Sequence, residues 1–142
     1  MAFLVDTNVL LFAFDHRSPA KRAVAEALLS EGISSNEARV AHQAVCEFVA
    51  AATRRGRSGE AALLTPHEAR IEAELLLSQF VVLYPDEHIL RLALRGWATY
   101  GFGWWDAHMW AHAEGNSLGL IYSEDFQHDR LYGKVRVVNP FI

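Results

Sequence analysis

The chain has 142 residues, of which 51% are hydrophobic and 21% are charged. These proportions are close to the averages of globular proteins and argue against a disordered or fibrous protein. A domain of this size buries roughly two-thirds of the surface that its unfolded chain exposes, so we expect one domain over residues 1–142. The formal net charge of -4 argues against broad, nonspecific adhesion to nucleic acid, which depends on lysine and arginine.

The first half of the chain predicts two strands and two helices. An unbroken apolar run at 3–5 is typical of a strand that is buried on both faces, as in parallel sheets. The Ser-Pro pair at 18–19 predicts the start of an amphipathic helix that ends at Gly32. A weaker strand at 39–41 leads into a second helix, which we expect to end at Gly56.

The second half predicts three more helices and three more strands. Thr65 to Glu68 combines a capping box with a proline at the first helical position, so a helix is expected from there to about Ser78. The remaining elements are strands at 80–84, 118–122 and 135–138, and helices from Pro85 to Gly101 and from Gly103 to Gly115. Alternating strands and helices predict a doubly wound, mostly parallel α/β sheet flanked by helices on both faces.

Cysteine usage and the N-terminal sequence bear on the compartment. Cys46 is the only cysteine, which excludes an internal disulfide framework and a cysteine-rich zinc site and is typical of a reducing compartment. The apolar start has no basic region and is interrupted by Asp6, so we expect no signal peptide. No apolar stretch approaches the length of a membrane span. We therefore expect a cytoplasmic protein.

Four acidic residues occupy positions that favour a shared site. Asp6 directly follows the first predicted strand, and Asp125 follows the fourth, so the two converge if those strands are neighbours. Asp106 lies at the start of the helix that leads into the fourth strand, and Glu47 lies near the start of the helix after the second. Solvent exposure is the default for any single acid, but Asp6 stands in an apolar run and Asp106 shares a helix face with apolar residues. Acids in such surroundings require a partner or a metal.

Four segments of the chain resemble the PIN-domain ribonucleases, and more closely the VapC-type toxins of type II toxin-antitoxin systems. They are FLVDTNVLLFAFD, QAVCEFVAAATR, GWWDAHMWAHAEG and LIYSEDFQHDRLYGKVRVVNPF, and together they span almost the whole chain. The resemblance implies a PIN-like α/β/α sandwich with an acidic quartet that holds the metal and two polar supports. The quartet is Asp6, Glu47, Asp106 and Asp125, and the supports are Asn8 and Ser123. It also implies Mg2+ or Mn2+ as cofactor, single-stranded regions of RNA as substrate, a cognate antitoxin and a homodimer.

The expected function is therefore that of a metal-dependent endoribonuclease in which metal-activated water attacks a phosphodiester bond. Two alternatives stay open. An aspartyl-phosphate phosphatase also places an Asp after its first strand, but it requires a second Asp two positions on, where Asn8 stands. A catalytically weak PIN-like module would bind RNA or a protein partner through its acidic pocket without needing a metal.

Three histidines are weaker candidates for a site. His108 and His112 have the i, i+4 spacing of a zinc pair, but they project from the opposite side of their helix to Asp106. We therefore expect them at the surface or at an interface, and not among the ligands of the same metal. His128 follows Asp125 closely and is expected to be a loop residue.

Two further clusters each have two interpretations. Arg54, Arg55 and Arg57 form the one obvious basic cluster, which fits either an RNA contact or a cationic helix end. The aromatic residues could stack on RNA bases, but their helical spacing beside apolar residues favours the core or a homodimer interface. They are Trp97, Tyr100, Phe102, Trp104, Trp105 and Trp110.

Overall fold

A single six-stranded sheet forms the centre of the computed structural model, which describes residues 1–142. Its order is β3-β2-β1-β4-β6-β5, so the strand order reverses between β1 and β4. Five strands run parallel, and β5 runs antiparallel to β6. The bounds are β1 Phe3–Val5, β2 Ala38–Ala41, β3 Val81–Leu83, β4 Leu120–Tyr122, β5 Arg130–Tyr132 and β6 Val135–Val138. The predicted fold class, a mostly parallel α/β sheet with helices, is confirmed.

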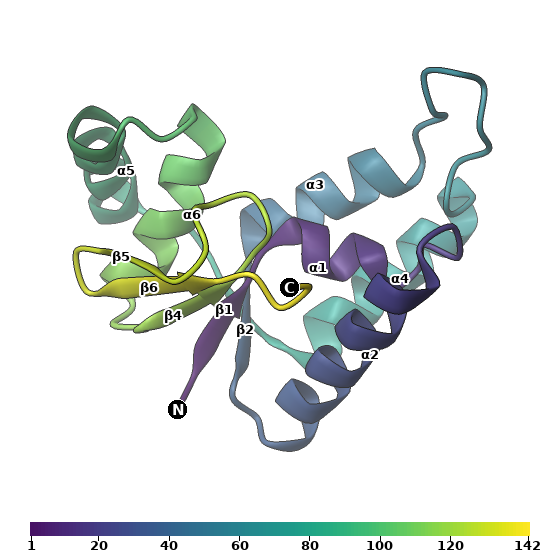
Figure 1. Cartoon of the computed structure of the whole chain (residues 1–142), viewed down its shortest axis with the longest axis horizontal. Coiled ribbons are helices and arrows are strands. Elements are labelled where there is room, and N and C mark those ends of the chain that lie inside the picture. Colours follow the sequence, from purple (N-terminus) through teal and green to yellow (C-terminus); the bar gives the residue numbers. More distant parts are fainter.

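Six helices surround this sheet in two groups. They are α1 Thr7–Phe12, α2 Pro19–Ser34, α3 His42–Ala52, α4 Pro66–Gln79, α5 Glu87–Tyr100 and α6 Trp104–Gly115. Figure 1 shows α5 and α6 stacked beside the β4–β6 half of the sheet, whereas α1 to α4 lie together on the other side of the picture. One cluster of buried apolar side chains joins both groups to the sheet. None of the helices combines the length and apolar character that crossing a membrane requires.

Side-chain caps fix the starts of two helices, and the one at Thr65 was predicted. The Thr65 hydroxyl accepts a hydrogen bond from the Glu68 backbone N–H at 3.1 Å, and the Glu68 carboxylate accepts one from the Thr65 N–H at 2.9 Å. Asp86 caps α5 by accepting from the Ile89 N–H at 2.9 Å, and Gly101 ends that helix with a φ of 69°. These side chains satisfy backbone N–H groups that have no partner inside the helix.

The sequence did not predict α1 and β5. Helix α1 has 6 residues, fewer than two turns, so it shows no helical periodicity, and β5 has only 3 residues. Helix α3 ends at Ala52 and not at Gly56, because Gly56 belongs to the following loop, where its N–H donates to the Glu60 carbonyl at 3.0 Å.

Glycine at position 32 does not stop its helix. Helix α2 continues to Ser34, two residues beyond the predicted end. A Cβ at Gly32 would lie 2.6 Å from the Cβ of Ala38 in β2, so only glycine allows α2 to approach the sheet this closely. The residue is therefore required for packing, which a single sequence does not distinguish from a helix end.

Candidate active site

The neighbouring ends of β1 and β4 bring distant parts of the chain together. Val5 pairs with Tyr122, and Asp6 and Ser123 directly follow this pair. The backbone N–H of Asp6 donates to the Tyr122 carbonyl at 3.0 Å, which extends the ladder by one step. The condition stated for Asp6 and Asp125 to converge, that the first and fourth predicted strands are neighbours, is therefore met.

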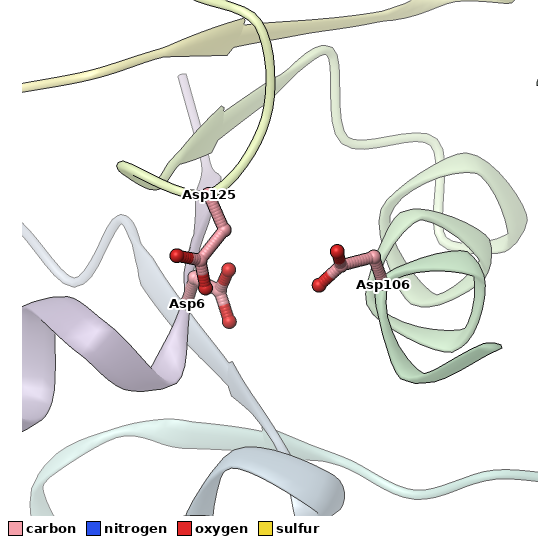
Figure 2. Close-up of side chains that lie close together, drawn as sticks. All are labelled: Asp6, Asp106 and Asp125. Carbon is pink, nitrogen blue, oxygen red and sulfur yellow. The ribbon is translucent and has the colours of Figure 1, made fainter. Parts of the chain in front are cut away.

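Three aspartates form a group at this point, which we call the acid pocket. Asp6, Asp106 and Asp125 each offer a carboxylate oxygen, and these oxygens lie within 4.8 Å of one another. Figure 2 shows Asp106 on α6 facing Asp6 and Asp125 from the other side of the pocket. Asp6 is only 4% exposed, Asp106 is partly buried and Asp125 is exposed. The pocket is therefore open to solvent on the Asp125 side.

Hydrogen bonds fix the two carboxylates on the strand side of the pocket. The Ser123 hydroxyl donates to Asp6 Oδ2 at 2.6 Å, and the Thr7 backbone N–H donates to Asp6 Oδ1 at 2.7 Å. The Asn8 amide donates to Asp125 Oδ2 at 3.1 Å and to the Ser123 hydroxyl at 3.2 Å. Asn8 and Ser123 therefore connect the two ends of the chain and orient both carboxylates.

Glu47 lies beside the acid pocket but outside the group of three. It stands in the middle of α3, not near its start, because that helix runs from His42 to Ala52. Its Oε1 accepts hydrogen bonds from the Thr7 hydroxyl at 3.1 Å and from the Gln43 amide at 2.9 Å. Both bonds go to the same oxygen, which leaves Oε2 available to water or to a ligand.

Burial raises the pKa of two carboxyl groups in the pocket. Asp6 reaches a pKa of about 7, because burial and the charges of Asp125 and Asp106 outweigh the hydrogen bonds from Ser123 and Thr7. Asp106 reaches a pKa of about 6, through burial and then through the charges of Asp125 and Glu47. Such a set of oxygen donors fits a hard divalent cation, whose charge would offset the repulsion among the carboxylates.

The two histidines of α6 lie elsewhere. His112 is only 1% exposed, so the expected surface or interface position is wrong for this residue. The reason is that α6 is buried on several faces, since Met109 to Ala113 are all buried. His108 is partly buried between Trp104 and Trp105, with ring centroids 4.4 and 5.3 Å away. Neither histidine belongs to the group of metal-competent carboxylates.

Sequence reasoning missed a cavity of about 580 Å3 on the α3 side of the acid pocket, here called the histidine cavity. Its walls come from α3, the loop before α5, and α6. The principal side chains are His42, Cys46 and Glu47 from α3 and Trp105, His108 and His112 from α6. The available signal was a pair of i, i+4 spacings, His42 with Cys46 and His108 with His112, on two helices that adjoin predicted site residues.

A second groove, of about 410 Å3, includes Asn8 and Glu124 and extends to the basic cluster. Arg54, Arg55 and Arg57 line it from the loop that follows α3, and all three are exposed. His128 is an exposed loop residue, as expected, and its Nδ1 accepts from the Asn139 backbone N–H at 3.0 Å.

The aromatic residues include a packed set, an exposed pair and the partly buried Trp104. Tyr100, Phe102 and Trp110 pack with Tyr132, and the Trp110 ring N–H donates to the Tyr132 carbonyl at 3.0 Å. Trp97 and Trp105 are 49% and 60% exposed, so the core interpretation does not hold for them.

Several solved structures share this fold. The chain is similar to a toxin-antitoxin complex from Klebsiella pneumoniae, with a TM-score of 0.70, 18% identity and coverage of 99% of this chain and 98% of the other. It is similar to DNA-bound VapBC from Salmonella typhimurium, with a TM-score of 0.67, 17% identity and 96% coverage of each chain. It is also similar to a sarcin-ricin loop cleaving VapC toxin from Mycobacterium tuberculosis, with a TM-score of 0.68, 14% identity and coverage of 87% and 90%.

Sequence comparison agrees with the fold. No curated protein matches the chain. The model of the PIN domain family, however, matches residues 3–134, which contain the acid pocket, Glu47 and both polar supports. The chain therefore belongs to the PIN domain family.

Proposed function

We propose that this protein is a Mg2+-dependent or Mn2+-dependent endoribonuclease and the VapC-type toxin of a toxin-antitoxin pair. The observation that carries the proposal is the convergence of Asp6, Asp106 and Asp125, from three separate parts of the chain, where the strand order reverses. Family membership supports nuclease chemistry. The similar structures are toxin-antitoxin complexes and a toxin that cleaves the sarcin-ricin loop, which supports RNA as the substrate.

The side chains divide the chemical work. Asp6, Asp106 and Asp125 would hold the cation. The hydrogen bond from Ser123 keeps Asp6 in position, and the one from Asn8 keeps Asp125 in position. A bound divalent cation supplies an acidified water and stabilises the charge of the attacked phosphate. Glu47 Oε2 carries no hydrogen bond from the protein and adjoins Asp106, so it is available to accept a proton or to orient water.

The basic groove supports a nucleic-acid substrate in spite of the overall negative charge. Arg54, Arg55 and Arg57 form no ion pair within the chain, and their groove reaches Asn8 of the acid pocket. Arginine side chains in a groove that reaches the pocket would contact phosphates that flank the cleaved bond. The favourable charge is thus local, which is consistent with a net charge of -4.

We also infer an antitoxin partner, a homodimer and, because a single cysteine is typical of a reducing compartment, a cytoplasmic location. Two of the similar structures are complexes of toxin with antitoxin, which supports the antitoxin partner. Leu90, Leu94 and Trp97 are between 44% and 49% exposed and share one face of α5, which supports a further protein interface.

The deciding experiment is an RNA cleavage assay with purified protein in Mg2+, in Mn2+ and in chelator. We expect wild type to cut a structured RNA at defined positions only when a divalent cation is present. Asp6→Asn should abolish cleavage because it removes a charged ligand and preserves shape. The matched control is Asp129→Asn, at an exposed aspartate outside the pocket whose φ of 59° asparagine tolerates.

Cleavage in chelator, or undiminished cleavage by folded Asp6→Asn, would contradict the proposal. RNA binding without cleavage under every condition would instead favour the alternative, a catalytically weak module that binds through the acidic pocket.

A further inference from the structure

The loop that carries Asp125 depends on side chains for its position. It spans residues 123–129, between β4 and β5. The backbone N–H groups of Ser123 and Asp129 donate to carbonyls of β6 at 3.0 and 2.8 Å, so both ends of the loop are fixed to the sheet. Between these ends, the N–H groups of Glu124 and Asp125 donate to side chains and not to the backbone. The position of Asp125 in the acid pocket therefore depends on what holds this segment.

An ion pair from a distant helix reaches the same segment. The Lys21 ammonium on α2 donates to Glu124 Oε2 at 2.9 Å, and Glu124 stands between Ser123 and Asp125 in the chain. The protein has seven ion pairs, and this is the only one between two side chains that are more than 7 positions apart. Pairs within one helix or turn stabilise local structure, whereas this pair joins α2 to the loop between β4 and β5.

Two aromatic rings hold the Lys21 ammonium beside Glu124. It lies 4.6 Å from the ring centroid of Phe12 in α1 and 5.6 Å from that of Phe141, which follows β6. The two rings pack edge to face with centroids 5.0 Å apart. Cation–π contacts at such distances are attractive, so the ammonium is favoured at this one position. We call Lys21, Glu124, Phe12 and Phe141 the lysine clamp.

Two other roles for Lys21 fit the structure less well. A lysine that contacts RNA phosphates needs a free ammonium, but that of Lys21 is paired, and the residue does not line the basic groove. A purely stabilising role is also weak, because the side chains of Lys21 and Glu124 are 42% and 25% exposed and ion pairs exposed to water contribute little to stability. What distinguishes this pair is its place beside Ser123 and Asp125.

We propose that Lys21 is a positioning residue of the acid pocket, which acts through Glu124 to hold the loop at 123–129. In this position the Ser123 hydroxyl reaches Asp6, and Asp125 completes the group of three carboxylates. The inference rests on the proposed function for the cation and the reaction, and on the lysine clamp itself for the position of the loop. Residues that support metal ligands in this way typically change metal affinity or activity by about 10–100-fold.

The first measurement needs neither cation nor RNA. Exchange of amide hydrogens with water is followed by NMR in chelator for wild type, Lys21→Met and Lys21→Arg. The N–H groups of Glu124 and Asp125 donate to Asn8 Oδ1 at 3.3 Å and to the Ser123 hydroxyl at 3.0 Å, so their exchange reports opening of the loop. Lys21→Met keeps an unbranched side chain and removes the charge, so it should speed exchange at both amides about three- to tenfold. Lys21→Arg should restore most of the protection, because arginine keeps the charge and stacks on aromatic rings.

Arg22→Met is the matched control. Arg22 is the next residue of α2, its side chain is 45% exposed, and it pairs with Glu26 of the same helix at 2.8 Å. This variant also loses one ion pair, but one that does not touch the loop. The exchange at Glu124 and Asp125 should therefore match that of wild type. Equal acceleration in Arg22→Met and Lys21→Met would overturn the proposal, because it would indicate a general loss of stability in α2.

Metal binding and cleavage test the consequence for the acid pocket. Lys21→Met should raise the Kd for Mn2+, measured by calorimetry, about tenfold, and should lower kcat for RNA cleavage at subsaturating Mg2+. The KM for RNA should stay close to that of wild type, because the basic groove does not include Lys21. A raised KM with unchanged kcat and unchanged Kd would overturn the proposal and would assign Lys21 to RNA binding.

The double variant Lys21→Met/Glu124→Gln separates anchoring of the loop from neutralisation of charge. Glu124 lines the basic groove, so without Lys21 its carboxylate would itself repel RNA. If Lys21 acts by anchoring, the double variant should stay as impaired as Lys21→Met, since the loop is still released. Recovery to wild-type cleavage would overturn the proposal, because it would mean that Lys21 only neutralises Glu124.

The two proposals fail separately. If wild type shows no metal-dependent RNA cleavage, the ribonuclease proposal is refuted, and amide exchange in chelator still decides whether Lys21 holds the loop. If wild type cleaves RNA, and Lys21→Met exchanges its amides and cleaves RNA as wild type does, the positioning role is refuted and the ribonuclease proposal stands.

Discussion

The acid pocket and the histidine cavity lie on either side of Glu47, but their buried polar groups differ in what they lack. In the acid pocket, Asp6 accepts hydrogen bonds from Ser123 and Thr7, so what it lacks is positive charge. At the histidine cavity, the His112 imidazole and the Gln43 amide are neutral. What His112 Nδ1 and Gln43 Oε1 lack is a hydrogen-bond partner. The first region therefore has negative charge that nothing in the chain neutralises, and the second has hydrogen-bonding capacity that nothing in the chain satisfies.

Burial also acts with opposite sign on the two regions. It disfavours whichever form of a group is charged, so it raises the pKa of Asp6 to about 7 and lowers the pKa of His112 to about 4. Both groups are therefore biased toward neutrality, one by holding a proton and the other by losing it. This contrast leads to three predictions, which run from the largest expected effect to the smallest.

The largest effect is expected from the proposed cation ligands of the acid pocket. Asp106→Asn should lower kcat/KM for RNA cleavage by more than about a hundredfold, because it removes a carboxylate from the group of three. Glu47→Gln should lower it by about 10–100-fold, the cost of disturbing a residue that supports the ligands. Single-turnover cleavage at saturating Mg2+ measures both. Equal losses in the two variants would place Glu47 among the ligands themselves.

An intermediate effect is expected on stability in the presence of Mg2+. A ligand that binds only the native state stabilises it by about 2.7 kcal/mol at a hundredfold excess over Kd, so the melting temperature of wild type should rise with Mg2+. Asp6→Asn should melt at a higher temperature than wild type in chelator, because it relieves repulsion and burial of charge, and should lose most of the Mg2+ response. Thermal melts with and without Mg2+ test this. A variant that is less stable than wild type in chelator would give Asp6 a structural role.

The smallest effect is a change in the pH dependence of stability in chelator. Between the ordinary pKa of 3.8 and the folded value of about 7 for Asp6, the native state binds more protons, so Asp6 makes the free energy of unfolding fall as pH rises. Between the folded value of about 4 and the ordinary 6.5 for His112, the unfolded state binds more protons, so His112 makes that free energy rise with pH.

Substitutions should separate these two contributions. Relative to wild type, Asp6→Asn should make the slope of unfolding free energy against pH more positive, by up to about 1.4 kcal/mol per pH unit between the two Asp6 values. His112→Leu should make the slope more negative between the two His112 values. Urea unfolding of the three proteins at several pH values measures both slopes. Slopes that change in the same direction would contradict the comparison of the two regions.

The parts of this protein that sequence predicted well are those encoded locally. The capping box at Thr65 and the helix end at Gly101 rely on neighbours in the chain, and both helices have the predicted character. The convergence of Asp6 with Asp125 was conditional on strand adjacency, because nothing within either segment specifies which strands pair.

The parts that were missed depend on contacts between distant segments. The burial of His112 results from the packing of α6 on several sides, whereas a helical wheel for one helix assumes a single buried face. The histidine cavity forms between α3 and α6, and the role of Gly32 follows from its contact with Ala38 in β2. These features arise from tertiary packing, which periodicity along the chain does not encode.

The hydrogen bond from Ser123 to Asp6 joins residues 117 positions apart, and this separation has a consequence for biosynthesis. A chain leaves the ribosome N-terminus first, so β1 and Asp6 emerge long before β4, Ser123 and Asp125. The acid pocket cannot assemble while the last part of the chain is still being translated. On the proposed function, the protein would therefore stay inert as a nascent polypeptide, and the message that encodes it would be exposed to cleavage only by finished copies.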